Sequence, residues 1–172
     1  MRKVEVEKFN DIWSDLFLLE AQKLEQLFGE NMIEIHHIGS TAVKGLKAKP
    51  VIDIMPVVQD LSLVDQKNDE MKAIGYEAMG ENGLVGRRFF RKGGDLRSHH
   101  VHLYERGNPD IDRHLAFRDY LIEHPEDRSL YGETKAELAE RFPFDMEAYI
   151  DGKDALVREI ETKALEWYRN RG

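Results

Sequence analysis

The feature that most restricts how this chain can fold is the apolar run Val-Ile-Asp-Ile-Met at residues 51–55, which contains one carboxylate, Asp53. The pair Lys49-Pro50 comes directly before it, and a residue that precedes proline is biased towards extended backbone. A short and nearly continuous apolar run is typical of a strand that is covered on both faces. An unpaired carboxylate is costly to bury, so Asp53 needs a hydrogen-bond donor or a cation beside it. The sequence therefore predicts a buried strand that carries one acid.

The segments around this run show the periodicities of helices and strands. Apolar residues recur at helical spacing from residue 12 to residue 28, where Gly29 stops the pattern. Residues 33–38 alternate as a strand does, and residues 4–6 predict a second, shorter strand in the same way. Residues 61–74 suit one further helix.

The second half of the chain changes from strands to helices. Glycine-rich turns separate three predicted strands, at residues 76–79, 84–91 and 98–104, which suits a meander. Helical patterns follow at residues 111–123, 126–141 and 145–168. This order predicts an α+β fold, with a mixed β-sheet flanked by helices and then a C-terminal helical segment. The length of 172 residues suits a single domain over residues 1–172, with a sheet-containing core at 1–105 and a helical part at 106–172.

Composition excludes several kinds of site and partner. The chain has no cysteine, which excludes disulfides and thiolate zinc sites and is compatible with a reducing compartment. The N-terminus lacks the apolar segment of a signal peptide and no run of 18 apolar residues occurs, so we expect a cytoplasmic protein without a membrane partner. A formal net charge of −8 argues against nucleic acid as a partner. Residues 37–104 nevertheless hold ten Lys or Arg against eight Asp or Glu, so this stretch could bind an anion locally.

The turn Gly39-Ser40 and the acid Asp53 together suggest a phosphate site. A strand that ends in Gly-Ser presents free backbone amides at a helix start, with Ser40 as the expected N-cap, and a phosphate can approach such amides closely. Asp53 could hold a divalent metal that bridges to that phosphate, and Lys49 could contact the phosphate as a point charge. Each feature has a structural alternative, because Gly-Ser is often only a turn and a buried Asp often bonds to the main chain.

Two histidines could complete a metal site. His100 and His102 alternate on one predicted strand face, so they could converge on a single ion. If this strand pairs near Asp53, one carboxylate and two imidazoles would suit manganese, iron or zinc better than magnesium. The alternative is a hydrogen-bonded sheet face without a metal. Arg87, Arg88 or Arg118 could bind a phosphate through two parallel hydrogen bonds. The alternative is surface solvation for Arg87 and Arg88, and a salt bridge with a neighbouring helix for Arg118.

Longer motifs resemble a known family. The resemblance rests on His37-Ile38-Gly39-Ser40-Thr41-Ala42-Val43, Gly45-Leu46, Ala48-Lys49-Pro50, Ile52-Asp53-Ile54, Gly75-Tyr76, His100-Val101-His102, His124-Pro125, Tyr131, Lys135, Tyr149 and Lys153. This pattern is similar to that of the GrpB-like family of small bacterial proteins, and to a domain appended to some dephospho-coenzyme A kinases. The family resembles the nucleotidyltransferase-fold superfamily, which implies a nucleotidyltransferase-like mixed sheet and a Gly-Ser segment that binds a nucleoside triphosphate.

The chain departs from the superfamily at one position that matters for catalysis. Active members carry two acids alternating on one strand, whereas this chain has Met55 on the same strand face as Asp53. A thioether is not a ligand for a hard cation, so two-metal transfer is in doubt. A lesser departure is Lys44, where the family usually has proline; it adds a cation beside the proposed phosphate site.

These observations lead to one main functional prediction. We expect a nucleotidyltransferase-like protein that binds a nucleotide or another phosphorylated small molecule at Gly39, Ser40 and Lys49. A divalent ion (Mg, Mn or Zn) would be held by Asp53, His100 and His102, which would also serve any nucleotidyl or phosphoryl transfer. The alternatives are a catalytically inactive binding or scaffold domain and a metal-dependent phosphohydrolase.

Overall fold

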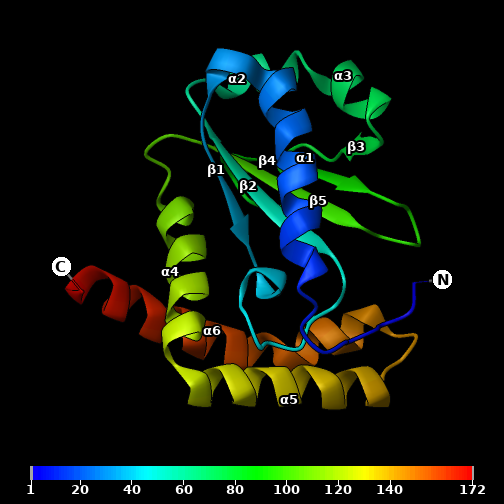
Figure 1. Ribbon diagram of the computed structural model, residues 1–172, viewed down its shortest axis with the longest axis vertical. Helices are drawn as coiled ribbons and strands as arrows, with labels where there is room; N and C mark the ends of the chain where they lie inside the picture. The colour runs from blue at the N-terminus through cyan, green and yellow to red at the C-terminus, as the bar shows by residue number, and fades with distance from the viewer. Residues whose placement is uncertain (1, 172) are drawn as a thin grey trace.

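The computed structural model describes residues 2–171, and its centre is a mixed five-stranded sheet with strand order β1-β2-β5-β4-β3 (Figure 1). The strands are β1 Met32–Ile38, β2 Ile52–Val58, β3 Tyr76–Ala78, β4 Arg87–Lys92 and β5 His99–Glu105. β2 and β5 pair in parallel, and the other neighbours are antiparallel. The predicted mixed sheet and the meander through β3, β4 and β5 are confirmed.

The central position of β2 explains its apolar sequence. Ile52 and Ile54 point to one face, where they pack beneath helix α1 (Ile12–Phe28) in the main hydrophobic core. Asp53 and Met55 therefore point to the opposite face. Met55 is fully buried there with Ile38 and Tyr104. Asp53 is thus the polar exception on a strand that is otherwise buried on both faces.

Three long helices gather at the end of the sheet where β1 finishes and β2 begins (Figure 1). They are α4 Pro109–Glu123, α5 Pro125–Arg141 and α6 Met146–Asn170. Their shared core includes Ala116, Ile160 and Ala164, and it also buries Val43 and Leu46 from the connection between β1 and β2. The turn after β1 is therefore packed between the sheet and the helices.

The prediction of one helix at residues 61–74 is wrong. The structure has two short helices, α2 (Leu61–Asp65) and α3 (Asn68–Ala73). Asp60 caps α2 by accepting a hydrogen bond from the Ser62 amide at 2.8 Å. Gln66 and Lys67 separate α2 from α3, and the Lys67 backbone, with φ −105° and ψ 11°, departs from α-helical geometry there.

The predicted strand at residues 4–6 is also wrong. Within residues 2–11, the described part of the N-terminal segment, a single β-bridge joins Glu7 to Ala48. Val4 donates its amide hydrogen to the Pro143 carbonyl at 2.8 Å. Val4 is buried against Leu138 and Tyr149 of the helical part. The alternation of Val4 and Val6 thus reflects packing against helices and not a place in the sheet.

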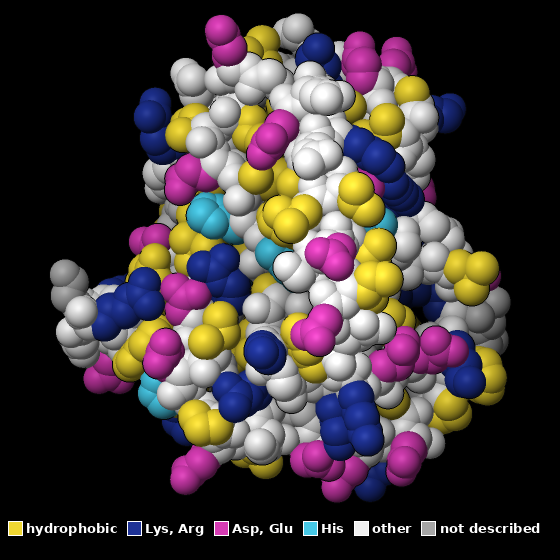
Figure 2. Space-filling model, viewed as in Figure 1, with side chains coloured by type: hydrophobic (Ala, Val, Ile, Leu, Met, Phe, Trp, Pro, Cys, Tyr) yellow, Lys and Arg dark blue, Asp and Glu magenta, His cyan; other side chains and the backbone are white. Residues whose placement is uncertain are grey.

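The length of the helices and the distribution of surface charge both concern the partners that the sequence predicts. No helix within residues 2–171 is both long and apolar enough to cross a membrane. Figure 2 shows Lys, Arg, Asp and Glu side chains interspersed over the face of the molecule that is viewed in Figure 1. That face presents no broad field of one charge sign.

Candidate functional site

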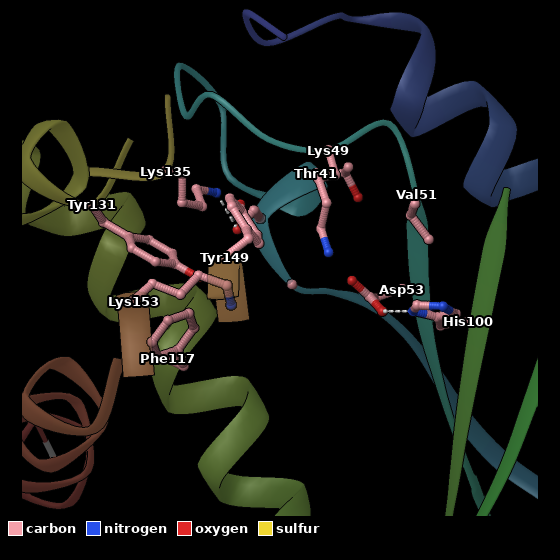
Figure 3. Close-up of a pocket in the computed structure, with 12 residues that line it drawn as sticks. Thr41, Lys49, Val51, Asp53, His100, Phe117, Tyr131, Lys135, Tyr149 and Lys153 are labelled. Carbon is pink, nitrogen blue, oxygen red and sulfur yellow. Dashed lines mark hydrogen bonds and ion pairs between the residues drawn. The ribbon is translucent and has the colours of Figure 1, made fainter. Parts of the chain in front are cut away.

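A cavity of about 180 Å³ lies between the sheet and the C-terminal helices (Figure 3). Its lining comprises Gly39, Ser40, Thr41, Lys49, Val51, Asp53, His100, Phe117, Tyr131, Lys135, Tyr149 and Lys153. The sequence predicts six site residues, and five of them line this cavity directly. The sixth, His102, lies next to Asp53 on the same sheet face. The structure therefore brings together all six nominated residues.

Gly39 is required at the turn for two independent reasons. Its backbone has φ 73° and ψ −172°, a region that only glycine occupies readily. A Cβ atom at this position would lie 2.5 Å from Asp53 Oδ2, so the close approach of turn and acid depends on its absence. Asp53 thus points towards the turn, as the phosphate-site hypothesis requires.

Ser40 is placed differently from the prediction. The turn after β1 is a 3-10 helix, Ser40–Ala42, with Gly39 in the cap position, so Ser40 is not the N-cap. Its side chain faces the cavity, where Ser40 Oγ accepts a hydrogen bond from Lys135 Nζ at 2.7 Å. The leading amides of such a short helix have no partner within it, so they remain available to a ligand.

Asp53 lies beside both histidines because of the strand register. The parallel pairing of β2 and β5 sets Asp53 opposite His100. His100 Nδ1 lies 3.4 Å and His102 Nε2 lies 3.0 Å from Asp53 Oδ1. Burial opposes the charge on Asp53, but the hydrogen bonds from the two imidazoles outweigh it and hold the pKa of this carboxyl far below its usual range. Asp53 is an anion at any ordinary pH.

The same three residues fit a metal site. One ligand atom from each of Asp53, His100 and His102 lies within 4.8 Å of the others. Two imidazole nitrogens and one carboxylate oxygen form a donor set that suits zinc, manganese or iron. His102 Nδ1 is buried without a hydrogen-bond partner among the described residues. That ring therefore meets other polar groups through Nε2, the atom that faces Asp53.

Three lysines make the rest of the cavity positive. Lys135 of α5 is buried at 3% exposure, and Lys49 and Lys153 are half-buried. Burial lowers the pKa of all three amines, and the charge of Lys153 assists it in lowering the pKa of Lys49 to about 8. In Figure 3 the Lys49 side chain points towards Asp53, with Lys135 and Lys153 on the helical side. Among the described residues that line the cavity, Asp53 is the one carboxylate, so positive charge is in surplus.

The three nominated arginines do not line this cavity. Arg88 forms an ion pair with Asp65 at 2.6 Å, and Arg87 donates to the main-chain carbonyls of Glu81 and Asn82. Arg118 bonds to its neighbour Asp119 and to the His37 carbonyl. Arg88 is thus ion-paired and not simply solvated, and Arg118 pairs with a residue of its own helix and not with a neighbouring helix.

Local sequence patterns predict no role for the residues that the helices contribute to the cavity. Lys135, Lys153, Tyr131 and Tyr149 appeared only as members of the family pattern. One signal was present in α5, where Tyr131, Lys135 and Leu138 share helical spacing and all three are buried. A lysine in an otherwise apolar helical stripe is unusual, and here it marks the wall of the cavity.

Sequence matches point to one family. A family model described as "GrpB protein" matches residues 3–163. The UPF0157 protein YqkA of Bacillus subtilis (strain 168) is 46% identical over 170 residues, which are 99% of this chain and 50% of that protein. The chain thus spans half the length of this relative. A dephospho-CoA kinase of Mycolicibacterium paratuberculosis is 26% identical across 88% of this chain and 44% of that protein.

A solved structure supports the same family assignment. The crystal structure of conserved protein GrpB from Enterococcus faecalis has a TM-score of 0.94 and 44% sequence identity, and the match covers 96% of this chain and 100% of that chain. The MgGTP-bound Cid1 poly(U) polymerase matches more distantly, with a TM-score of 0.44 and 15% identity over 68% of this chain and 42% of that chain. The resemblances to GrpB-like proteins and to part of the dephospho-CoA kinases are confirmed.

Proposed function

Because the chain belongs to the GrpB family, whose model matches nearly all of it, we propose that its cavity binds the phosphates of a nucleotide or a similar phosphorylated small molecule. The supporting observation is the surplus of positive charge from Lys49, Lys135 and Lys153 next to a single ionised carboxylate. A protonated amine that is withdrawn from water is stabilised when an anion comes into contact with it. A polyphosphate supplies several negative charges in a small volume.

The turn and the acid favour phosphate over other anions. The leading amides of the 3-10 helix and Ser40 Oγ offer hydrogen-bond donors, and Gly39 lets the ligand approach the backbone closely. Asp53 would repel a bare phosphate, so its position calls for a cation between the two. Asp53, His100 and His102 would hold a divalent metal there. Such an ion supplies neutralisation of the phosphate oxygens and polarisation of the phosphorus centre.

If the protein is an enzyme, the reaction class proposed is nucleotidyl or phosphoryl transfer. Met55 is fully buried against Ile38 and Tyr104, so this chain provides one acid where a two-metal site needs two. A single metal on Asp53 and the two histidines, with the lysines as further charge on the phosphates, is the arrangement that these residues support.

Thermal unfolding with adenosine triphosphate tests the proposal. We expect the triphosphate to stabilise the protein when Mn²⁺ or Mg²⁺ is present, by about 2.7 kcal/mol at a hundred times its dissociation constant. Asp53→Asn should abolish this stabilisation. Asp65→Asn is the matched control, because its carboxylate pairs with Arg88 outside the cavity. Equal responses of both variants and the original protein would contradict the proposal.

A second candidate function is metal-dependent phosphohydrolysis. The observation that favours it is the two-histidine donor set, which suits zinc or manganese better than magnesium. Metal content after purification and the rate of p-nitrophenyl phosphate hydrolysis would both fall in His100→Gln and in His102→Gln. Hydrolysis that stays unchanged in both variants excludes this candidate.

The third candidate is a binding domain without catalysis, which the buried Met55 favours. It predicts triphosphate stabilisation that depends on Lys135 but is insensitive to added metal. Metal-dependent turnover of any phosphoester that is lost in Asp53→Asn would exclude it.

A further inference from the structure

A second cavity adjoins the first on the side of the β4–β5 turn. Its volume is about 320 Å³, and it shares Lys49 and Val51 with the first cavity. Arg2, Lys3 and Arg97 also line it. The wall around Lys49 therefore has a cavity on each side, and Asp53 lies close to that wall (Figure 3).

Two of the four cations that line this second cavity, Lys49 and Arg97, contact neutral groups, while Glu77 and Asp95 act on Arg97 electrostatically. Arg97 donates from Nε to the Gly94 carbonyl at 3.2 Å and bonds through Nη1 to His100 Nε2 at 3.1 Å. Lys49 Nζ lies 3.8 Å from Met146 Sδ and 5.2 Å from the centre of the Tyr149 ring. Neither contact neutralises a positive charge. Lys3, by contrast, pairs with Glu5 at 3.8 Å.

The position of Arg97 is fixed by its turn. The Leu96 amide donates to the Gly93 carbonyl and the Ser98 amide donates to the Lys92 carbonyl, both at 2.9 Å. A Cβ atom on Gly93 would lie 2.3 Å from the Leu96 carbonyl oxygen, so the turn needs glycine there. A rigid turn presents the guanidinium without the loss of loop entropy that a mobile segment would incur on binding.

The charges that line the second cavity also favour the binding of an anion there. Burial lowers the pKa of Arg2 and repulsion from Arg91 lowers it further, while the charge of Asp95 opposes this shift. The carboxylates of Glu5 and Asp95 also line the cavity, so four basic side chains face two acidic ones. An anion between Arg2, Lys49 and Arg97 would relieve this repulsion.

We propose that this second cavity binds the phosphate of a second substrate, a small phosphorylated acceptor, while the first cavity holds the triphosphate. The assignment rests on the function proposed above and adds the class of the other ligand. Two guanidiniums and an ammonium offer donors to several oxygens at once, which suits a phosphate better than a carboxylate. Leu96, 89% exposed at the rim, offers an apolar surface to the rest of the molecule.

The contact between Arg97 and His100 links the two cavities. His100 Nδ1 faces Asp53 Oδ1 at 3.4 Å while its Nε2 faces Arg97. A phosphate on Arg97 would therefore lie one imidazole away from the acid. This places the acceptor on the sheet side of Asp53 and the triphosphate on the side of Ser40, Lys135 and Lys153.

Calorimetric titration of inorganic phosphate tests the assignment. The protein is first saturated with Mg²⁺ and a non-hydrolysable ATP analogue, and phosphate is then added. We expect one further phosphate per chain, bound at least tenfold more weakly by Arg97→Gln and by Arg2→Gln. Arg2 lines the second cavity but not the first, so the Arg2 variant separates the second cavity from the first. Arg106→Gln, an exposed position at the far end of β5, is the matched control.

Several outcomes overturn the proposal. The proposal of a second site is wrong if the protein loaded with the ATP analogue binds no phosphate. It is also wrong if all three variants bind phosphate equally well. Acetate that binds as well as phosphate excludes the phosphate assignment, and a short RNA that displaces phosphate with higher affinity reassigns the cavity to a nucleic-acid end. If the ATP analogue itself fails to bind, the function proposed above falls. Phosphate binding that still depends on Arg97 would then support the anion site alone.

Discussion

The two faces of the sheet each bury a cluster of charged and polar side chains, and the clusters differ in how closely their charges are paired. Beneath α1, Glu20 accepts from Lys92 Nζ at 2.6 Å and from the Tyr76 hydroxyl at 2.9 Å, with Lys23 at 3.5 Å. Burial opposes its ionisation, but these partners keep the pKa of Glu20 below its ordinary value. On the opposite face, three lysines share a cavity with Asp53.

Neighbouring residues of β5 divide between the two clusters. His99 lies 4.0 Å from Glu20, whereas His100 lies beside Asp53 on the other face. The Glu20 cluster has a partner for each charge within hydrogen-bond or ion-pair distance, so it stabilises the fold and leaves nothing for a ligand. The Asp53 cavity holds three lysines for one carboxylate, at a cost in stability that a bound anion would offset. Ion pairing, and not burial alone, therefore separates the structural cluster from the candidate site.

The largest expected effect is on the structural cluster. Glu20→Ala leaves Lys92 with its carboxylate partner gone, and we expect a loss of roughly 3–5 kcal/mol in the free energy of unfolding. Urea denaturation measures it. Glu77→Ala is the control, since its pair with Arg91 is on the surface and its loss should leave the urea midpoint nearly unchanged. Similar midpoints for the two variants would break the contrast between the clusters.

The next effect concerns the turn at the candidate site. Gly39→Ala forces a Cβ atom against Asp53 and a non-glycine residue into a strained backbone, so we expect a loss of about 2–3 kcal/mol together with loss of triphosphate binding. Gly94→Ala is the matched control, with φ 58° but nothing within 4 Å of the added atom. Its smaller loss measures the backbone cost alone. The claim about close approach fails if both variants unfold at the same denaturant concentration.

Removal of a surplus cation should weaken binding without weakening the fold. In Lys135→Met we expect triphosphate affinity to fall about tenfold, or about 1.4 kcal/mol, while the unfolding temperature stays level or rises. The reason is that a buried amine with a depressed pKa is replaced by an apolar side chain of similar length. Lys47→Met, whose amine pairs with Glu133 outside the cavity, is the control. A destabilisation as large as that of Glu20→Ala would show that Lys135 is structural.

The smallest expected effect is a pH dependence that has opposite signs for binding and for stability. Lys49 has a pKa of about 8 in the empty protein, and a bound anion should raise it, so binding takes up protons. Anion affinity should therefore fall as pH rises above about 8. Stability of the empty protein behaves in the opposite way. The unfolded chain binds this proton more tightly, so this contribution to stability increases as pH rises from about 8 towards the ordinary lysine value.

Calorimetry in buffers of different ionisation enthalpy measures the proton uptake, and thermal unfolding over the same pH range measures the stability. Lys49→Met should reduce the uptake. Affinity that is constant up to pH 10 would contradict the assignment of Lys49 to the anion site.

The sequence predicted the sheet well because its strands carry strong local signals. Residues 51–55 and the alternation in residues 98–104 specify strands, and the glycines between them specify the turns. The division of residues 61–74 was missed because apolar spacing continues across the break, while the Asp60 cap acts locally. The N-terminal segment was misread because Val4 packs against helices that are remote in sequence.

The site residues that could be predicted are likewise those whose positions follow from local sequence patterns. Asp53, His100 and His102 could be brought together in prediction because alternation on two strands fixes which side chains share a face, and a single pairing then unites them. The contributions of Lys135 and Lys153 could not be predicted by such reasoning. They depend on how the C-terminal helices pack against the end of the sheet, which no local pattern encodes.

Part of the cavity wall is formed by α6, the last helix described, through Tyr149 and Lys153. During synthesis the cavity cannot exist until α6 has left the ribosome and docked. A ligand that needs this cavity can therefore neither guide the sheet as it forms nor shield the nascent chain from proteases. It stabilises only the finished molecule, by holding the late helices to the strands that were made before them.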